Sequence, residues 1–156
     1  MSRAFVKEDS DAPPPQFDRP VSSAPNLVTE RGARLIDDSV ARIEAALADD
    51  PADEETLRRD LRYWTARRAS ARLVERDPAP VSAGFGARVT IRRGGRQSEI
   101  EIVGEDEADP ADGTVAWTSP LARALEGAEP GETVELVAAG RSEAIEVVAV
   151  GPGRAR

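Results

Sequence analysis

Acidic side chains gather at two places along the chain, and their carboxylates are the groups best suited to chemistry. One group follows an apolar, helix-like stretch and consists of Asp49, Asp50, Asp53, Glu54 and Glu55. The other lies in a loop and includes Glu105, Asp106 and Asp109. Carboxylate oxygens are natural ligands of Mg²⁺ and Ca²⁺. The loop, however, lacks the glycine and the terminal glutamate of a calcium-binding loop, so we expect no metal site there.

Several enzyme classes are excluded by residues that the chain does not have. Its 156 residues include no cysteine and no histidine. This rules out a thiolate nucleophile, a disulfide framework, cysteine-ligated zinc and histidine-dependent acid–base catalysis. The sequence has no G-x-x-x-x-G-K-[ST] phosphate loop, and Gly84-Phe85-Gly86 lacks the third glycine of a dinucleotide fingerprint. We therefore expect no cofactor belonging to the protein itself.

The net charge points to the kind of partner. Lys and Arg number 21 against 29 Asp and Glu, which gives −8 at pH 7. This is the wrong sign for a protein held on nucleic acid by its overall field. A basic protein surface or a divalent cation fits better. No run approaches the ~18 apolar residues of a membrane span, and the first residues lack the apolar core of a signal peptide. We expect a cytoplasmic protein without a membrane partner.

The first half of the chain predicts a disordered arm followed by a helical hairpin. Residues 1–26 are rich in proline and have little to bury. From there, apolar residues step by four, three and four, which predicts a helix from Glu30 to Ala48; they are Ile36, Val40, Ile43 and Leu47. Asp50-Pro51 reads as an N-cap followed by proline at the first helical position, so a second helix is expected to begin there.

Two helices joined by a short connection must lie antiparallel, so residues 27–76 should form a finger on the order of 30 to 40 Å long. The second helix carries many arginines, which raises the possibility of RNA binding. We favour pairing with acids on the first helix and with acids one turn away on the same helix. These arginines are Arg58, Arg59, Arg62, Arg67, Arg68, Arg72 and Arg76.

The second half predicts a small β domain. Residues 77–84 are polar and contain proline, so we take them as a linker and expect few contacts between the finger and the β domain. Apolar residues then alternate on either side of Gly94-Gly95, which predicts a β-hairpin. Ser119-Pro120 opens a short helix, and two more strands come after it. The expected class is α+β, with an antiparallel sheet over residues 85–150 and a tail at 151–156.

Four stretches give this order of parts a family likeness. They are Phe85-Gly86-Ala87, Ile102-Val103-Gly104-Glu105-Asp106-Glu107-Ala108-Asp109, Ser119-Pro120-Leu121-Ala122-Arg123-Ala124-Leu125-Glu126-Gly127 and Pro130-Gly131-Glu132-Thr133-Val134. Over about residues 27–150, the chain resembles the GreA/GreB family of bacterial transcription elongation factors.

The resemblance implies an FK506-binding-protein-like C-terminal domain that docks on RNA polymerase near its secondary channel, and a coiled-coil finger that enters the channel. It implies a regulator of the polymerase rather than an enzyme, with DNA association only through the polymerase. We expect a monomer, because the seam of the finger is already satisfied within the hairpin. Within the resemblance, the residues expected to contact the polymerase are Ser119, Pro120, Leu121, Arg123, Glu105, Asp106 and Asp109.

The finger tip departs from the family pattern, which leaves two interpretations of its acids. In the family, carboxylates at the tip help to hold a second Mg²⁺ in the polymerase active site, so that the polymerase cuts the backtracked transcript. This chain lacks the usual Gly-Asp-Leu-x-Glu-Asn-Ala-Glu-Tyr stretch, although its own tip acids are possible replacements. Helix capping and helix-dipole compensation also account for them. We favour a regulator that does not stimulate cleavage, with an active cleavage factor as the alternative.

Two functions from other classes fit less well. A prolyl isomerase or chaperone on the same fold would need a deep aromatic-lined pocket, and the domain offers only Phe85 and Trp117 for it. A coiled-coil adaptor that dimerises through the finger would need a longer free seam than about three heptads.

Overall fold

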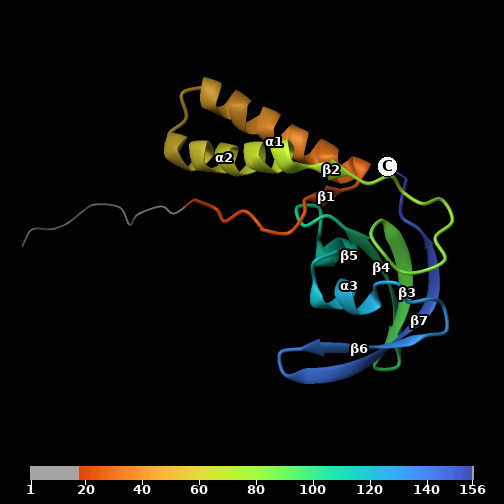
Figure 1. The fold of residues 1–156 in the computed structure, drawn as a ribbon. Helices are drawn as coiled ribbons and strands as arrows, with labels where there is room; N and C mark the ends of the chain where they lie inside the picture. The colour runs from red at the N-terminus through yellow and green to blue at the C-terminus, as the bar shows by residue number, and fades with distance from the viewer. Residues whose placement is uncertain (1–17, 156) are drawn as a thin grey trace, which may run out of the picture.

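The computed structural model describes residues 18–155, so residues 1–17 of the expected arm lie outside the described part of the chain. A helical hairpin lies beside a strongly curled sheet, and the two meet at the base of the hairpin (Figure 1). This is the expected α+β arrangement of a finger and a β domain. Within residues 18–155, no helix has the length and apolar character needed to cross a membrane.

The first helix of the hairpin, α1 (Glu30–Ala48), has the predicted bounds. Its N-cap is Thr29, whose side chain accepts a hydrogen bond from the backbone N–H of Gly32. The predicted apolar stripe is confirmed, because Ile36, Val40 and Ile43 are all buried.

The second helix, α2 (Glu54–Ser70), begins later than the sequence suggested. Asp50 was expected to cap it, but its φ of 49° places it in the left-handed region, where it turns the chain between the helices. An N-cap residue usually has extended backbone, so Asp50 cannot serve. Asp53 takes the N-cap position without a side-chain hydrogen bond. At 1.5 Å per residue, the 19 and 17 residues of α1 and α2 make a finger about 26 to 28 Å long.

A two-stranded parallel sheet closes the base of the hairpin, and the sequence did not predict it. It pairs β1 (Leu27–Val28) with β2 (Arg72–Leu73). The backbone N–H of Arg72 donates to the carbonyl of Asn26 at 2.8 Å, and that of Val74 donates to Val28 at 3.0 Å. The chain entering α1 is therefore tied to the chain leaving α2.

The C-terminal domain is a five-stranded sheet in the order β5-β4-β3-β7-β6. Its strands are β3 (Ala87–Arg93), β4 (Arg96–Val103), β5 (Thr114–Ala116), β6 (Thr133–Ala138) and β7 (Arg141–Pro152). The predicted β3–β4 hairpin is confirmed, and its turn residues Gly94 and Gly95 have φ of 54° and 76°. Glycine adopts such values without the steric cost of a Cβ.

One strand pair corrects the expected antiparallel sheet. β5 runs parallel to β4, with Ile102 opposite Val115, so the sheet is mixed. The acidic loop and the short 3₁₀ helix η1 (Pro110–Asp112) carry the chain from the end of β4 back alongside it. A return of this kind makes the next strand parallel.

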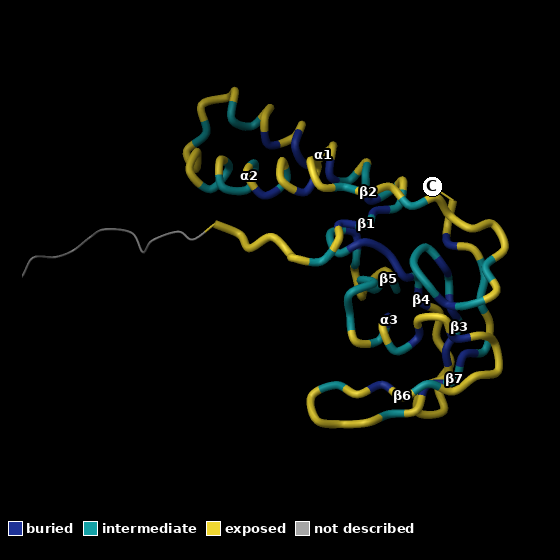
Figure 2. The backbone as a smooth tube through the Cα atoms, in the orientation of Figure 1, coloured by how far each residue is buried: buried dark blue, intermediate teal, exposed yellow. Residues whose placement is uncertain are grey.

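The two faces of the sheet differ in chemistry. The inner face supplies the core, including Val89, Ile91 and Ile102, and the short helix α3 (Pro120–Leu125) adds Leu125 to it. On the outer face, Arg88 pairs with Glu99 at 3.3 Å and Arg92 pairs with Glu146 at 2.6 Å, and these four side chains are 36% to 48% exposed. Figure 2 shows the buried backbone concentrated in the middle of the sheet and along the facing sides of the hairpin.

Candidate functional site

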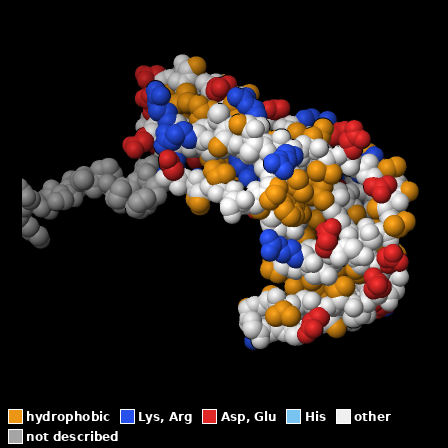
Figure 3. Space-filling model, viewed as in Figure 1, with side chains coloured by type: hydrophobic (Ala, Val, Ile, Leu, Met, Phe, Trp, Pro, Cys, Tyr) orange, Lys and Arg blue, Asp and Glu red, His pale blue; other side chains and the backbone are white. Residues whose placement is uncertain are grey.

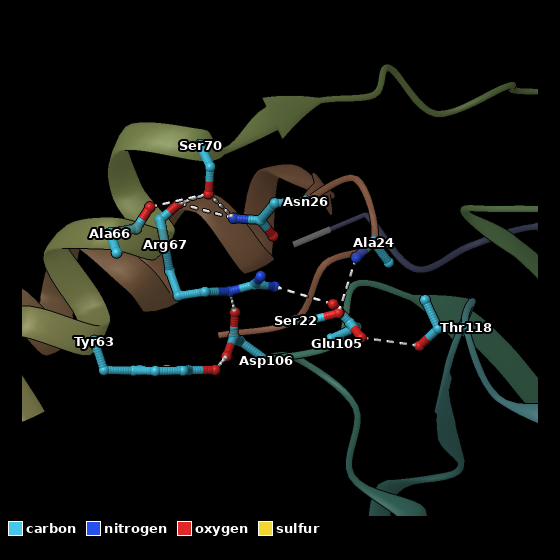
Figure 4. A network of polar contacts seen from close by, with 10 residues as sticks. All are labelled: Ser22, Ala24, Asn26, Tyr63, Ala66, Arg67, Ser70, Glu105, Asp106 and Thr118. Carbon is cyan, nitrogen blue, oxygen red and sulfur yellow. Dashed lines mark hydrogen bonds and ion pairs between the residues drawn. The ribbon is translucent and has the colours of Figure 1, made fainter. Parts of the chain in front are cut away.

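A buried arginine lies where the hairpin meets the C-terminal domain (Figure 4). Arg67 projects from α2, and only 2% of its side chain is exposed. Its Nε donates to Oδ2 of Asp106 at 2.5 Å, and its Nη2 lies 3.4 Å from Oε2 of Glu105. A buried charge is tolerated only when it is paired and hydrogen-bonded, and both conditions are met here.

Two further side chains complete the polar partners of these acids. The hydroxyl of Tyr63, one turn before Arg67 on α2, donates to Oδ1 of Asp106. Burial and this hydrogen bond raise the pKa of Tyr63 to about 12, so its hydroxyl stays protonated and remains a donor. The hydroxyl of Thr118 donates to Oε1 of Glu105 at 3.1 Å. The carboxylates of Glu105 and Asp106 therefore both have partners within the protein.

The next acid along the loop, Glu107, binds the start of α1 instead. The hydroxyl of Thr29 donates to Oε2 of Glu107 at 2.6 Å, and Nε of Arg31 lies 3.7 Å from Oε1. Burial raises the pKa of Glu107, and the hydrogen bond from Thr29 partly offsets that rise. We call these residues the polar joint: Thr29, Arg31, Tyr63, Arg67, Glu105, Asp106 and Glu107.

The loop approaches the hairpin so closely that a side chain at its first position has no room. A Cβ added to Gly104 would lie 2.6 Å from the carbonyl oxygen of Leu27 in β1. That contact is with backbone, so it could not be relieved by a side-chain rotation. Glycine at this position therefore allows β1 and the acidic loop to lie side by side.

The polar joint corrects two expectations drawn from the sequence. The finger was expected to make few contacts with the C-terminal domain, yet they share a buried ion pair. Arg67 was expected to pair with acids of the hairpin itself, but its partners are Glu105 and Asp106. Arg58 does pair one turn away with Glu54, as predicted. Arg67 and Tyr63 were missed as joint residues, although their four-residue spacing on one helix face was a usable signal.

The residues expected to contact the polymerase lie in two separate settings. Glu105 and Asp106 belong to the polar joint, and Asp109 caps η1 by accepting from the backbone N–H of Ala111 at 2.9 Å. Ser119 caps α3 by accepting from Ala122 at 3.2 Å. Leu121 packs against the core. Pro120 and Arg123 on α3 are exposed, and so is Asp109, so these three are the members of the set most accessible to a partner.

The tip acids stand at the far end of the finger, away from the polar joint. Asp49, Asp50, Asp53, Glu54 and Glu55 are all exposed. Within residues 18–155, no three carboxylates converge in a way that could hold a metal ion. The tip acids therefore do not fit a Mg²⁺ site by themselves.

A groove of about 570 Å³ lies at the hairpin base, between the start of α1, the segment that follows β2 and the C-terminal tail, and part of the polar joint lines it. Its lining is mainly charged and includes Arg31, Arg76, Glu101 and Glu107. None of the residues lining it is aromatic. This groove therefore does not provide the aromatic pocket that a prolyl isomerase would need.

Breaking the buried pair should destabilise the protein strongly. In Asp106→Asn, the amide keeps the shape of the side chain but leaves the charge of Arg67 without its closest counter-charge. We expect a loss of about 3–5 kcal/mol in the free energy of unfolding, the usual cost of removing one partner of a buried pair. Urea denaturation followed by circular dichroism measures it. The control is Glu54→Gln, which breaks the exposed pair with Arg58 and should cost less than about 1 kcal/mol. Equal, small losses in both variants would contradict the role assigned to Asp106.

The raised pKa of Glu107 gives a second prediction, about pH. A carboxyl group whose pKa is higher in the folded chain favours folding most below the unfolded pKa, and this contribution is lost as pH rises through the folded pKa. Glu107→Gln does not titrate, yet its amide oxygen can still accept from Thr29. The stability of this variant relative to the parent should therefore increase from about pH 4 upward and level off above the folded pKa. Urea midpoints across this range test it, with Glu44→Gln at an exposed position as control. A relative stability that falls with rising pH would contradict the assignment.

Comparison with known proteins identifies the C-terminal domain. The family model "Transcription elongation factor, GreA/GreB, C-term" matches residues 79–152. The chain is 39% identical over 95 residues to GreB of Neisseria meningitidis, covering 59% of this chain and 58% of that protein. It is 47% identical over 68 residues to GreA of Hyphomonas neptunium, covering 42% and 43% of the two chains. The chain thus spans about half the length of these relatives.

The solved structures that match the chain include GreA factor homolog 1 of Thermus thermophilus, at 17% identity and a TM-score of 0.39, covering 81% of this chain and 99% of that one. A GreA/GreB factor from Nitrosomonas europaea gives 16% identity and a TM-score of 0.40, covering 80% and 98%. The likeness depends on the sequence matches to residues of the sheet, α3 and the acidic loop. Over its C-terminal domain, the chain is therefore similar to the GreA/GreB transcription elongation factors.

Proposed function

We propose that this protein binds bacterial RNA polymerase at its secondary channel and regulates transcription elongation. The observation that carries the proposal is the match of residues 79–152 to the C-terminal domain of the GreA/GreB factors. On this proposal the C-terminal domain docks on the polymerase and the finger points into the channel. The protein acts on the polymerase as a monomer in the cytoplasm, without catalysis of its own, and meets DNA only through that partner.

The polar joint supports these separate roles for the C-terminal domain and the finger. Arg67 and Tyr63 of α2 are bound to Asp106, which belongs to the docking domain. A finger fixed in this way keeps one direction relative to the docked domain, because a planar guanidinium and a carboxylate pair well in few geometries. The polymerase would therefore receive the finger at a defined angle.

We infer further that the protein does not stimulate transcript cleavage. The tip acids are exposed and do not converge on a metal position within the described residues. The tip also lacks the family stretch that supplies such carboxylates. Occupying the channel without assisting cleavage would make the protein a competitor of active cleavage factors.

The contact surface on α3 can be tested through Arg123. Its side chain is exposed and lies between Ala122, which is buried, and Ala124, which packs on the core. Arg123→Glu reverses the charge without disturbing that packing. If Arg123 is buried in the interface, the change should weaken binding to core polymerase by about 1–3 kcal/mol. Biolayer interferometry with immobilised core polymerase measures the affinity.

Arg96→Glu is the matched control, because it makes the same charge change at an exposed position at the start of β4. Both variants should keep the thermal melting curve of the parent. If Arg123→Glu binds as tightly as Arg96→Glu, the contact lies elsewhere on the domain.

The tip interpretation can be tested on backtracked polymerase. The wild-type protein should release no short 3′ transcript fragments in the presence of Mg²⁺. If the tip acids are ligands after all, the wild type will cleave, and Asp49→Asn with Asp53→Asn will abolish cleavage while binding is kept, since an amide is a much poorer Mg²⁺ ligand than a carboxylate. The outcome that contradicts our inference is therefore cleavage by the wild type that the double variant loses.

A further inference from the structure

The last part of the N-terminal arm lies along α2 instead of extending freely into solvent. Figure 1 shows residues 18–26 running beneath α2, from the hairpin base toward its middle. At the base, Asn26 is buried and its side-chain amide donates to the carbonyl of Arg67 at 2.8 Å and to the hydroxyl of Ser70 at 3.2 Å. The sequence had suggested that this segment stays solvated.

The other end of the segment is held by two cationic contacts. Nη2 of Arg62 donates to Oδ1 of Asp18 at 2.5 Å. The guanidinium carbon of Arg19 lies 3.8 Å from the centre of the Tyr63 ring and 5.6 Å from that of Trp64. Tyr63 and Trp64 themselves meet edge to face, with ring centres 5.2 Å apart. A cation over an aromatic face is attracted by the ring quadrupole.

A single side chain, that of Tyr63, lies between Arg19 and the buried ion pair of Arg67 and Asp106. The guanidinium of Arg19 covers the ring of Tyr63, and the hydroxyl of that ring donates to Asp106, the closest partner of Arg67. Tyr63 therefore joins the arm, the finger and the C-terminal domain in one series of contacts, beside the links made by Asn26 and Arg67. Removing the cation uncovers one face of the ring and weakens the restraint on its position.

We propose that Arg19 is a positioning residue that sets the direction of the finger on the C-terminal domain by holding Tyr63 on Asp106. We call the Arg19–Tyr63 contact the arm latch. With the latch closed, the finger keeps the angle seen in the structure; with it open, Tyr63 leaves Asp106 more readily and the finger samples other angles. The consequence for transcription rests on the proposed function, since the finger angle decides how the tip enters the channel. The latch itself is a property of the free chain.

Electron–electron distance measurements on the full chain test the latch directly. The chain has no cysteine, so Ala52→Cys at the tip and Ser98→Cys on β4, both at exposed positions, give one spin label on each part. The labelled parent should show one narrow distance distribution. Arg19→Ala should broaden it, with the ratio of latched to unlatched chains falling roughly 2- to 5-fold, as expected for loss of one cation–π contact of an exposed arginine. Arg19→Lys should restore part of the narrow distribution, because it keeps a cation but not the flat guanidinium.

Arg141→Ala, at an exposed position of β7, is the control and should leave the distribution unchanged. An unchanged distribution in Arg19→Ala would overturn the proposal, even if the melting temperature fell. Equal broadening in Arg19→Ala and Arg19→Lys would also overturn it, because the cation would then not be the cause. The distance measurements use the free chain without polymerase. They therefore test the arm latch independently of the experiments that test polymerase binding.

Discussion

The pairing of one buried guanidinium with Asp106 is the interaction on which the rest of the architecture depends. A charge as deeply buried as that of Arg67 must be paired, and its closest partner lies on the other half of the molecule. α2, the acidic loop and the arm therefore converge on one point, where Tyr63 and Asn26 add hydrogen bonds. A purely apolar contact between a short helix pair and a loop would allow many angles, whereas this polar contact favours one.

The same contacts give the residues around Gly104 a structural role within the protein. Its glycine admits β1 at close range, and each of its next three residues has partners inside the molecule. Glu105 and Asp106, which were among the residues expected to contact the polymerase, therefore help to attach the finger. The exposed residues Asp109, Pro120 and Arg123 remain as the more accessible part of the expected contact surface.

Figure 3 shows hydrophobic side chains gathered between the finger base and the lower part of the C-terminal domain, next to isolated charges.

Local patterns in the sequence were sufficient for the elements but not for the way they meet. The apolar spacing of α1 and the alternation of β3 and β4 depend on neighbours in the chain, so they could be predicted. The parallel pairing of β4 with β5 depends on the path of a loop, which no local pattern contains. Arg67 resembled the other arginines of α2, because only a partner 39 residues later distinguishes it. The prediction that Asp50 caps α2 was wrong. An aspartate before a proline is typical of an N-cap, but the left-handed backbone of Asp50 makes the turn between the helices instead.

The ion pairs on the outer face of the sheet respond to the solvent differently from the pair in the polar joint. Arg88, Arg92 and their partners are exposed, so dissolved ions screen them over a Debye length of about 8 Å at physiological ionic strength. Arg67 and Asp106 exclude those ions and are screened far less. Added salt therefore weakens the attractions between these exposed pairs while leaving the pair of Arg67 and Asp106 nearly intact. The exposed pair of Arg62 with Asp18 in the arm is screened as well, so the buried pair is the part of the finger attachment that salt affects least.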